Sequence, residues 1–516
     1  MAAGENDERF RIVILGGGTA GWMTAAGLVR RLRQDSYSIT LIESDEIGTV
    51  GVGEATLPHI KQFNDMLGFN EAEFMRATRA TFKVGIEFCD WDRPGQRYIH
   101  PFGAFGEPWG GTEFQHHWLR LQRNRRATLP FQAYSLAVAT GRANAFALPD
   151  EDPGSIRSTY SYAYHFDSGR YAAFLRQWAM ERGVVRIEGR VASVERDSSS
   201  GAILSLSLQS AERIEGDLFV DCSGFRSLLL GGELGVDWED WSRWLPCDCA
   251  LAVPCDHGRD GSITPYTRST ARTIGWQWRI PLQHRIGNGY IFSSQFGSVD
   301  QAREVLLANL DGAPQSEPKL LRFMPGRRTS AFAGNCVAIG LASGFLEPLE
   351  STSIFLIQAA VIDLIDLLPS PVRGKPVDPR LAAEFNRLSN MQYDRVRDFL
   401  ILHYAANRRE GEPLWDYLRT MALPDSLSHK MALFRARASA PEYQYGLFSR
   451  DSWLSVLLGQ GLEPSDYDPL ADTFDLDLVQ SKCADFAGRI DSAVAAMPSH
   501  SDFIAAYCAA SDSVAA

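Results

Sequence analysis

A glycine-rich segment near the amino terminus has the residue types and spacing needed to bind a dinucleotide. Its glycines follow the pattern Gly16-x-Gly18-x-x-Gly21. The first permits a tight turn, the second lets the backbone approach a pyrophosphate, and the third lets a helix pack closely on a strand. Glu43 follows at the distance expected for an acid that binds a ribose hydroxyl. The predicted cofactor contacts are Gly16, Gly18, Thr19, Ala20, Gly21 and Glu43.

The segments around these glycines predict a βαβ unit. Residues 12–15 are a β-branched apolar run, typical of a parallel strand buried on both faces. A helix-forming segment includes Thr24, and the N–H groups and dipole at the start of such a helix would face the phosphates. A second strand over 38–42 ends at Glu43. An ordinary βαβ unit with a glycine-rich turn is the alternative, and Glu43 argues against it.

A second glycine-punctuated loop covers residues 51–58, before a helix predicted through about Leu67. Its small residues and free N–H groups could lie against a flat ring or a phosphate, although a simple loop is the alternative. Later strand-to-glycine transitions at 216–224 and 334–344 are similar, and the second precedes an apolar helix over 354–368. The separated strand-glycine elements resemble those of a flavoprotein of the glutathione-reductase type, and this resemblance implies further cofactor contacts at Val52, Gly53, Glu54, Ala55, Gly340 and Leu341.

Other segments predict how the rest of the chain is organised. Residues 83–88 read as one strand. Residues 91–150 are rich in aromatics, glycine and proline, which favours an irregular region that lines a pocket. Beyond a linker at 369–376 the chain turns mostly helical, with apolar groups at helical spacing over 381–408.

Composition limits the class of protein. With 45% apolar and 22% charged residues, the 516-residue chain is typical of a soluble globular protein. A formal net charge of −12 argues against nucleic acid as a partner. The acidic amino terminus is no signal peptide, and residues 354–368 are too short and polar to cross a membrane. Eight scattered cysteines predict reduced thiols in the cytoplasm, and Cys247-x-Cys249 lacks the further ligands of a metal site.

Four motifs in order resemble one enzyme family. Residues 276–281, Trp-Gln-Trp-Arg-Ile-Pro, match the Trp-x-Trp-x-Ile-Pro motif of flavin-dependent halogenases. The Gly16 pattern with the 51–56 loop, Lys83 in Phe-Lys-x-Gly, and Phe-Leu-Glu-Pro-Leu-Glu-Ser-Thr at 345–352 follow that family's order. The resemblance is to its tryptophan branch, rather than to its phenol or carrier-protein branches, from about residue 10 to about 365.

The resemblance implies an α/β fold. Residues 1–368 would form an FAD-binding, Rossmann-type module like that of glutathione reductase, with substrate-binding segments interleaved at about 91–150 and 235–285. Residues 377–516 would form a helical cap over the substrate. Reduced FAD, O₂ and chloride or bromide would give hypohalous acid, which halogenates an aromatic ring.

The resemblance also assigns roles to two side chains. Lys83 would receive the hypohalous acid, either through hydrogen bonds from its ammonium or by forming a haloamine. A surface lysine beside a strand is the alternative. Glu350 would stabilise the cationic ring and take its proton. Glu347 is a separate residue that could instead satisfy the turn at Pro348.

Further family positions concern the halide and the substrate. Backbone N–H groups of Thr352 and Ser353 would hold the halide, although the family tends to have glycine at the second position, so the shape of that pocket does not carry over. Trp276 and Trp278 would separate flavin from substrate, with core packing as the alternative. His100 and Phe102 would clamp an indole ring. His116-His117 and Arg327-Arg328 have no family role and are interpreted as surface or packing residues.

The carboxyl-terminal part of the substrate site departs from the family. Tryptophan halogenases hold the charged end of the amino acid with adjacent tyrosines, a glutamate and a Phe-Trp pair. Here residues 442–453 show that pattern broken and shortened. Charged groups taken out of water without partners bind weakly. We therefore expect an indole-like or other electron-rich arene rather than free tryptophan, with further contacts from Tyr445, Phe448 and Trp453.

The sequence thus predicts a halogenase that uses FADH₂ and a halide ion. A separate NAD(P)H-dependent flavin reductase would supply the reduced flavin, because no second nucleotide motif occurs. The other partner is a small aromatic substrate, and a homodimer is left open. The rival functions are a single-component aromatic hydroxylase on the same fold and a non-catalytic FAD-binding redox protein. Lys83, Glu350 and the tryptophan pair disfavour both rivals.

Overall fold

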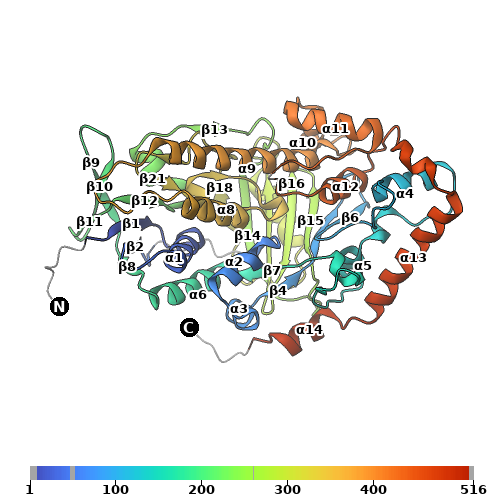
Figure 1. Ribbon diagram of the computed structural model, residues 1–516, viewed down its shortest axis with the longest axis horizontal. Coiled ribbons are helices and arrows are strands. Elements are labelled where there is room, and N and C mark those ends of the chain that lie inside the picture. Colours follow the sequence, from blue (N-terminus) through green and yellow to red (C-terminus); the bar gives the residue numbers. More distant parts are fainter. Residues whose placement is uncertain (1–7, 47–52, 260, 445, 511–516) are drawn as a thin grey trace.

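A six-stranded sheet carries the glycine-rich segment at its centre. The computed structural model describes residues 8–46, 53–259, 261–444 and 446–510 (Figure 1). The strand order is β20-β21-β12-β1-β2-β8, and all pairs are parallel except β20 with β21. The strands are β1 (Phe10–Leu15), β2 (Tyr37–Glu43), β8 (Val185–Glu188), β12 (Leu218–Asp221), β20 (Phe332–Ala333) and β21 (Cys336–Ala338). The predicted βαβ unit is confirmed.

Both faces of this sheet are covered. Ile12 and Ile14 face the core that includes the helices α1 (Thr19–Arg31), α6 (Ser168–Met180) and α8 (Ser353–Asp366). Val13 and Leu15 face a three-stranded sheet made of β9 (Val191–Arg196), β10 (Ile203–Leu208) and β11 (Arg213–Glu215). Burial on both faces explains why β1 is a continuous apolar run.

A seven-stranded sheet is the second large sheet of the fold, and its strand order is β18-β14-β17-β16-β15-β5-β6. All its neighbouring pairs are antiparallel except β15 with β5. Its strands are β5 (Gly85–Cys89), β6 (Arg97–Pro101), β14 (Cys249–Cys255), β15 (Thr267–Arg272), β16 (Gly275–Pro281), β17 (Ile286–Phe292) and β18 (Lys319–Arg322), and α7 (Val299–Ala308) packs against β14 and β17. Figure 1 shows this sheet beside the six-stranded one.

Small sheets connect the two large ones. In the first, β7 (Ala163–Asp167) lies between β3 (Gly53–Ala55) and β4 (Thr81–Lys83). In the second, β19 (Gly326–Arg328) lies between β13 (Trp238–Asp240) and β22 (Gly344–Phe345). The single strand predicted at 83–88 was therefore wrong: β4 and β5 belong to different sheets. A side chain at Gly85 would lie 2.5 Å from the carbonyl oxygen of His100, so glycine is needed where β5 meets β6.

Residues 91–150 are more regular than predicted. They contain β6, α4 (Phe114–Arg123) and α5 (Leu136–Arg142). In α4 the buried residues Phe114, His117 and Leu121 recur at helical spacing, and His117 stacks on Trp109 with 3.7 Å between ring centroids. His117 is therefore a packing residue. The glycine and proline content hid this periodicity, although most of those residues lie between the elements.

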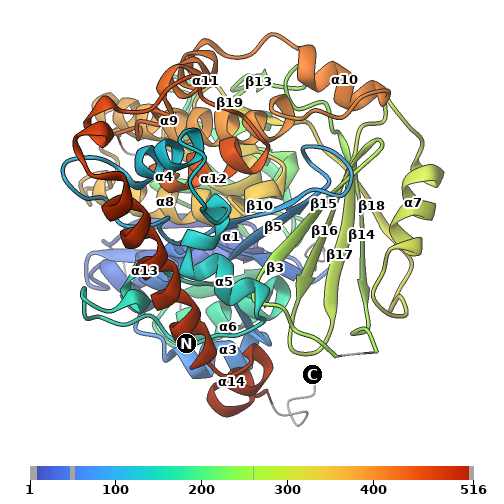
Figure 2. The same ribbon diagram turned by 90° about the vertical axis from the view of Figure 1, so that its right-hand side faces the viewer.

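The carboxyl-terminal helices wrap around the rest of the molecule. Figure 2 shows α13 (Leu476–Ala495) running along α5, and their residues are in contact. Farther on, the His500 ring accepts a hydrogen bond from the Phe82 N–H at 3.2 Å. These helices share the main core instead of building one of their own. The other α-helices are α2 (His59–Leu67), α3 (Glu71–Thr78), α9 (Pro379–Ala405), α10 (Pro413–Thr420), α11 (Asp425–Arg437), α12 (Arg450–Gly459) and α14 (His500–Tyr507).

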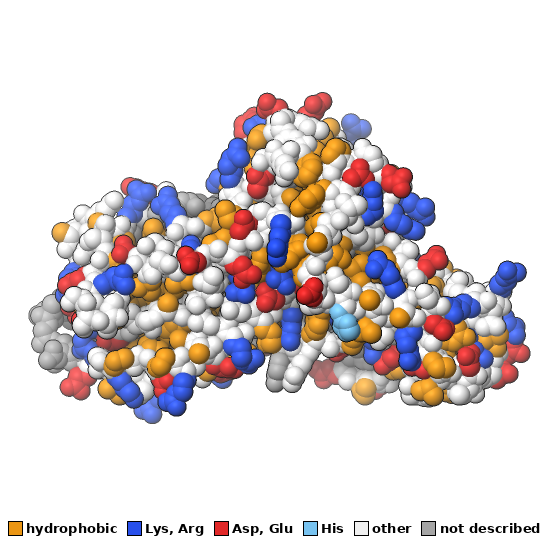
Figure 3. Space-filling model, turned by 90° about the horizontal axis from the view of Figure 1, so that it is seen from above, with side chains coloured by type: hydrophobic (Ala, Val, Ile, Leu, Met, Phe, Trp, Pro, Cys, Tyr) orange, Lys and Arg blue, Asp and Glu red, His pale blue; other side chains and the backbone are white. Residues whose placement is uncertain are grey.

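The face that carries α9, α10 and α11 has charges of both signs. Seen from above in Figure 3, Lys and Arg side chains alternate with Asp and Glu, and hydrophobic side chains gather over the middle. This face offers no continuous basic surface of the kind that binds a phosphate backbone.

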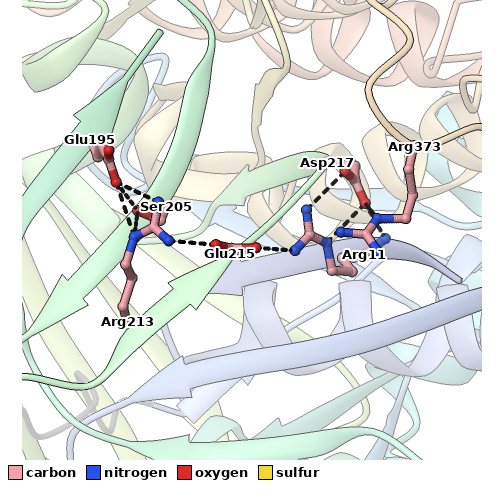
Figure 4. A network of polar contacts seen from close by, with 7 residues as sticks. All are labelled: Arg11, Glu195, Ser205, Arg213, Glu215, Asp217 and Arg373. Atoms are coloured by element: carbon pink, nitrogen blue, oxygen red, sulfur yellow. Dashed lines mark hydrogen bonds and ion pairs between the residues drawn. The ribbon is translucent and has the colours of Figure 1, made fainter. Parts of the chain in front are cut away.

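A network of ion pairs fastens β11 to the edge of β1 (Figure 4). Arg11 contacts Glu215 at 2.6 Å and Asp217 at 3.1 Å, and Arg213 contacts Glu195 at 2.6 Å. An exposed pair such as Arg213 with Glu195 typically contributes about 0.2–1 kcal/mol. Because Arg11 lies at the start of β1 and the glycines follow its end, the network is structural.

All eight cysteines are buried and free, as predicted. Over the part of the chain that the structure describes, no cluster of His, Cys, Asp and Glu is arranged to hold a metal ion. Within the same residues, no helix has the length and apolar character needed to cross a membrane.

Candidate active site

A first cavity, of about 290 Å³, opens beyond the carboxyl ends of β1, β12 and β21. This is the edge of a parallel sheet at which nucleotides bind. Several predicted cofactor contacts lie in its wall. The described lining includes Gly18, Thr19, Ala20, Glu54, Ala55, Trp278, Leu341, Ser351 and Ser353.

The glycines have the conformations that the motif requires. Gly16 has φ +116°, and a side chain there would lie 2.2 Å from the carbonyl oxygen of Cys222. A side chain at Gly21 would lie 1.8 Å from the carbonyl oxygen of Gly16. Gly18 faces open space and caps α1 without a side-chain hydrogen bond, so the N–H groups of the helix start are available. These features fit the pyrophosphate of FAD.

The remaining predicted cofactor residues differ in position. Glu43 pairs with Arg186 at 2.6 Å and accepts a bond from the Trp22 indole at 3.3 Å, contacts that the sequence did not reveal. Gly340, at φ +74°, packs against Ala20 and shapes the cavity wall without lining it. Gly53 lies in β3. Val52 is outside the described residues.

A second cavity, of about 320 Å³, lies on the other side of the loop after β3. His100, Phe102 and Phe448, which were predicted to contact the substrate, line this cavity, and its lining also includes Leu57, Pro58 and His59. Its polar mouth contains Ser158, Ser161, Ser449 and Ser452. No Lys, Arg, Asp or Glu side chain occurs among the described residues of this lining. Tyr445 is outside the described residues. Trp453 packs behind the wall of this cavity, with 4.9 Å between its ring centroid and that of Phe399.

Lys83 lies between the two cavities. Its buried ammonium nitrogen, Nζ, donates to the Thr56 carbonyl oxygen at 2.9 Å and to Ser351 Oγ at 2.8 Å. Ser351 lines the first cavity. On the other side Nζ lies 5.0 Å from the ring centroid of Phe102, which lines the second cavity.

The environment of Lys83 favours the neutral amine. Burial lowers its pKa to about 7, and the negative charge of Glu350 opposes this shift. Two hydrogens of Nζ are used by Thr56 and Ser351. The remaining position is a third N–H in the ammonium form and a lone pair in the neutral form.

Glu350 is a buried carboxylate held between two histidines. Its Oε2 lies 2.8 Å from His100 Nδ1, and its Oε1 lies 2.8 Å from His403 Nε2. Burial would raise the pKa of Glu350, but the contacts with His100 and His403 outweigh it and hold the pKa at about 2. The Nδ1 atom of His403 also faces the carbonyl oxygen of Phe399 at 2.8 Å, so both ring nitrogens of His403 face oxygen acceptors.

His403 was missed because nothing in the sequence marks it. It lies on α9, 53 residues after Glu350 in the sequence. Helical periodicity predicted that α9 buries one face, and His403 is one polar residue on that buried face.

Comparison with known proteins decides the family. The profile of the tryptophan halogenase family matches residues 11–476. This chain belongs to the tryptophan halogenase family. It is 37% identical to tryptophan 6-halogenase SttH from Streptomyces toxytricini, over 90% of this chain and 92% of that protein. It is 35% identical to tryptophan 7-halogenase RebH from Lentzea aerocolonigenes, over 89% and 91%.

A solved structure agrees over nearly the whole length. BrvH, a flavin-dependent halogenase from Brevundimonas sp. BAL3, is 44% identical, with a TM-score of 0.93 over 98% of this chain and 100% of that one. The expected function and fold are thereby confirmed: the protein is a flavin-dependent halogenase with mixed α/β sheets and a helical carboxyl-terminal region.

Only one residue of the tryptophan pair of the halogenase lines a cavity. Trp278 lines the first cavity, whereas Trp276 lines neither cavity. The Trp276 indole instead donates to Glu347 Oε2 at 2.8 Å. Glu347 also accepts a bond from Tyr404 OH, and burial raises its pKa to about 7. Glu347 is thus separate from Glu350, as expected, and it holds the Trp276 indole and the Tyr404 hydroxyl.

The residues predicted to hold halide lie at the start of α8. Ser351 has φ +59°, and this left-handed residue turns the chain sharply between Glu350 and the helix. Thr352 precedes the first helical residue, Ser353, and Ser353 lines the first cavity. The N–H groups of the first turn of a helix suit an anion.

Proposed function

We propose that this halogenase binds reduced FAD in the first cavity and an uncharged, electron-rich arene such as indole in the second. Lys83 and Glu350, which lie near both cavities, would then direct the halogen from the flavin to the arene. The observation that supports this most strongly is the place of Lys83, which contacts the wall of one cavity through Ser351 and the wall of the other through Phe102.

Reduced FAD, when bound, supplies the O₂ chemistry that oxidises halide to hypohalous acid. The N–H groups at Thr352 and Ser353 would hold the halide beside it. Lys83 would meet the oxidant with the one position of Nζ that Thr56 and Ser351 leave free. As ammonium it would polarise the oxidant, and as amine it would accept the halogen.

Glu350 would act on the halogenated ring. Its negative charge stabilises the cationic ring that forms after halogen transfer, and the same cluster removes the ring proton. His100 and His403 keep the carboxylate ionised. The general experiment is to supply reduced FAD, O₂, bromide and indole and to look by mass spectrometry for a monobrominated product. Oxygenated product without bromine would favour the hydroxylase instead.

The isolated halogenase is expected not to oxidise NADPH. Only one dinucleotide segment occurs in the sequence, so a separate flavin reductase would supply reduced flavin. The measurement is NADPH absorbance with purified protein, FAD and indole, with and without an added reductase. Rapid oxidation without the reductase, stimulated by indole, would contradict this and favour a single-component hydroxylase.

Indole is expected to be halogenated with about a hundredfold higher kcat/KM than L-tryptophan. The described lining of the second cavity provides His100, Phe102 and Phe448 for a flat ring but no charged side chain for an ammonium or a carboxylate. Burying such charges without partners costs several kcal/mol even after relaxation. Attack should follow the reactivity of the ring and favour carbon 3.

The measurement is a competition between equal concentrations of indole and tryptophan, analysed by mass spectrometry and NMR. 3-Methylindole is the matched control, because it adds bulk at the same ring position without charge. Clean halogenation of tryptophan on its benzo ring, with indole ignored, would show that the zwitterion has partners.

A further inference from the structure

The carboxylate assigned to proton removal is shielded from the substrate cavity. Glu350 is fully buried and lines neither cavity. Oε2 is hydrogen-bonded with His100 Nδ1, and Oε1 lies 2.8 Å from His403 Nε2. A direct transfer from the ring to Glu350 would require one of these contacts to break. Its pKa of about 2 also makes it a weak base.

His100 occupies the position between that carboxylate and the cavity. The ring lines the second cavity and directs Nδ1 to Glu350 at 2.8 Å. The imidazole therefore has Nδ1 engaged and Nε2 left as the nitrogen for a substrate atom. A histidine held by a carboxylate in this way has a fixed tautomer, with its hydrogen on Nδ1 and a lone pair on Nε2.

We propose that His100 is the base that removes the ring proton and that Glu350 orients His100 and stabilises its charged form. The inference rests on the proposed function of the two cavities. In this step the C–H bond at the halogenated carbon breaks, and its electron pair restores the aromatic ring. The proton passes to His100 Nε2, which gives an imidazolium paired with Glu350 and later releases the proton to water at the cavity mouth.

The decisive variant is His100→Phe, which keeps a flat ring in the clamp but has no base. Loss of a general base slows its step by about 10²–10⁴, so proton removal should become rate-limiting. The measurement compares turnover of indole with that of indole deuterated at carbon 3, with bromide. We expect rates that differ little in the natural protein and a clear primary isotope effect in His100→Phe.

Phe102→Leu is the matched control, because it alters the other ring of the clamp without touching a base. It should raise KM for indole and leave the isotope effect small. If His100→Phe retains more than a tenth of the natural kcat, or loses activity only through KM with no isotope effect, then His100 is a stacking residue and the proposal is wrong.

A second measurement needs neither flavin nor turnover. Nitrogen-15 NMR of the histidine rings in the free protein, with His100 assigned by its absence in His100→Phe, should show that the neutral His100 ring carries its hydrogen on Nδ1. Hydrogen on Nε2 would overturn the assignment. If instead the natural protein forms no halogenated product but shows this tautomer, the proposed function fails while the His100–Glu350 geometry stands.

Discussion

Replacing Lys83 by alanine should abolish halogenation while the oxidation of reduced FAD by O₂ continues at its normal rate. Nζ lies between the two cavities and contacts Ser351 on the flavin side, so its loss removes the group that meets the oxidant. Removing one group that stabilises a transition state typically costs about 10²–10³ in rate. The measurement pairs product yield with O₂ consumption, and the oxidant should appear as free hypohalous acid in a trapping assay.

Two further variants separate chemistry from packing. Lys83→Met fills the same buried space without an amine and should lose activity equally. Lys61→Ala removes an exposed lysine that pairs with Asp65 and should change nothing. Near-normal product with an unchanged isomer ratio in either Lys83 variant would show that this lysine does not direct the oxidant.

The pH dependence distinguishes the two roles open to Lys83. Because burial lowers its pKa to about 7, the ammonium form predominates below that pH and the neutral amine above it. Halogenation per flavin oxidised should therefore change through a midpoint near pH 7. A rise with pH indicates the haloamine, and a fall indicates the hydrogen-bonding ammonium. A flat profile from pH 6 to 8 would contradict both.

The flavin side of the site could be predicted because its chemistry is local in sequence. Gly16, Gly18 and Gly21 each meet a requirement set by the next strand or helix, and the structure reproduces those requirements in the close approaches at Gly16 and Gly21. Glu43 was found in the same way, by its distance along the chain. Its partner Arg186 was not, because that pairing depends on which strand lies beside β2.

The substrate side depends on contacts between distant segments. His403 and Tyr404 are consecutive on α9, yet His403 holds Glu350 and Tyr404 holds Glu347. A helical pattern predicts a buried face but does not say which loop that face meets. The same limit applies to Trp453, which is an aromatic residue near the cavity but packs behind its wall. The fold class follows from short-range sequence patterns, whereas the cluster of Glu350, His100 and His403 follows from tertiary packing.

Replacing Glu350 by glutamine should slow halogenation by about 10²–10⁴, the usual contribution of general base catalysis, because His100 loses the charge that stabilises its imidazolium form. Glutamine keeps the size and can still accept a hydrogen bond from His100 Nδ1, but it removes the negative charge between His100 and His403. Binding of FAD and KM for indole should change little, because Glu350 lines neither cavity. The measurement is kcat with bromide and indole.

Glu347→Gln is the matched control for this change. It alters a second buried glutamate of the same turn, whose partners are Trp276 and Tyr404 instead of the histidines. An amide oxygen can still accept the Trp276 N–H, so activity should fall far less than in Glu350→Gln. If Glu350→Gln loses less than tenfold while Glu347→Gln loses more, the charge needed for the reaction lies on Glu347. The cluster of Glu350, His100 and His403 would then be structural.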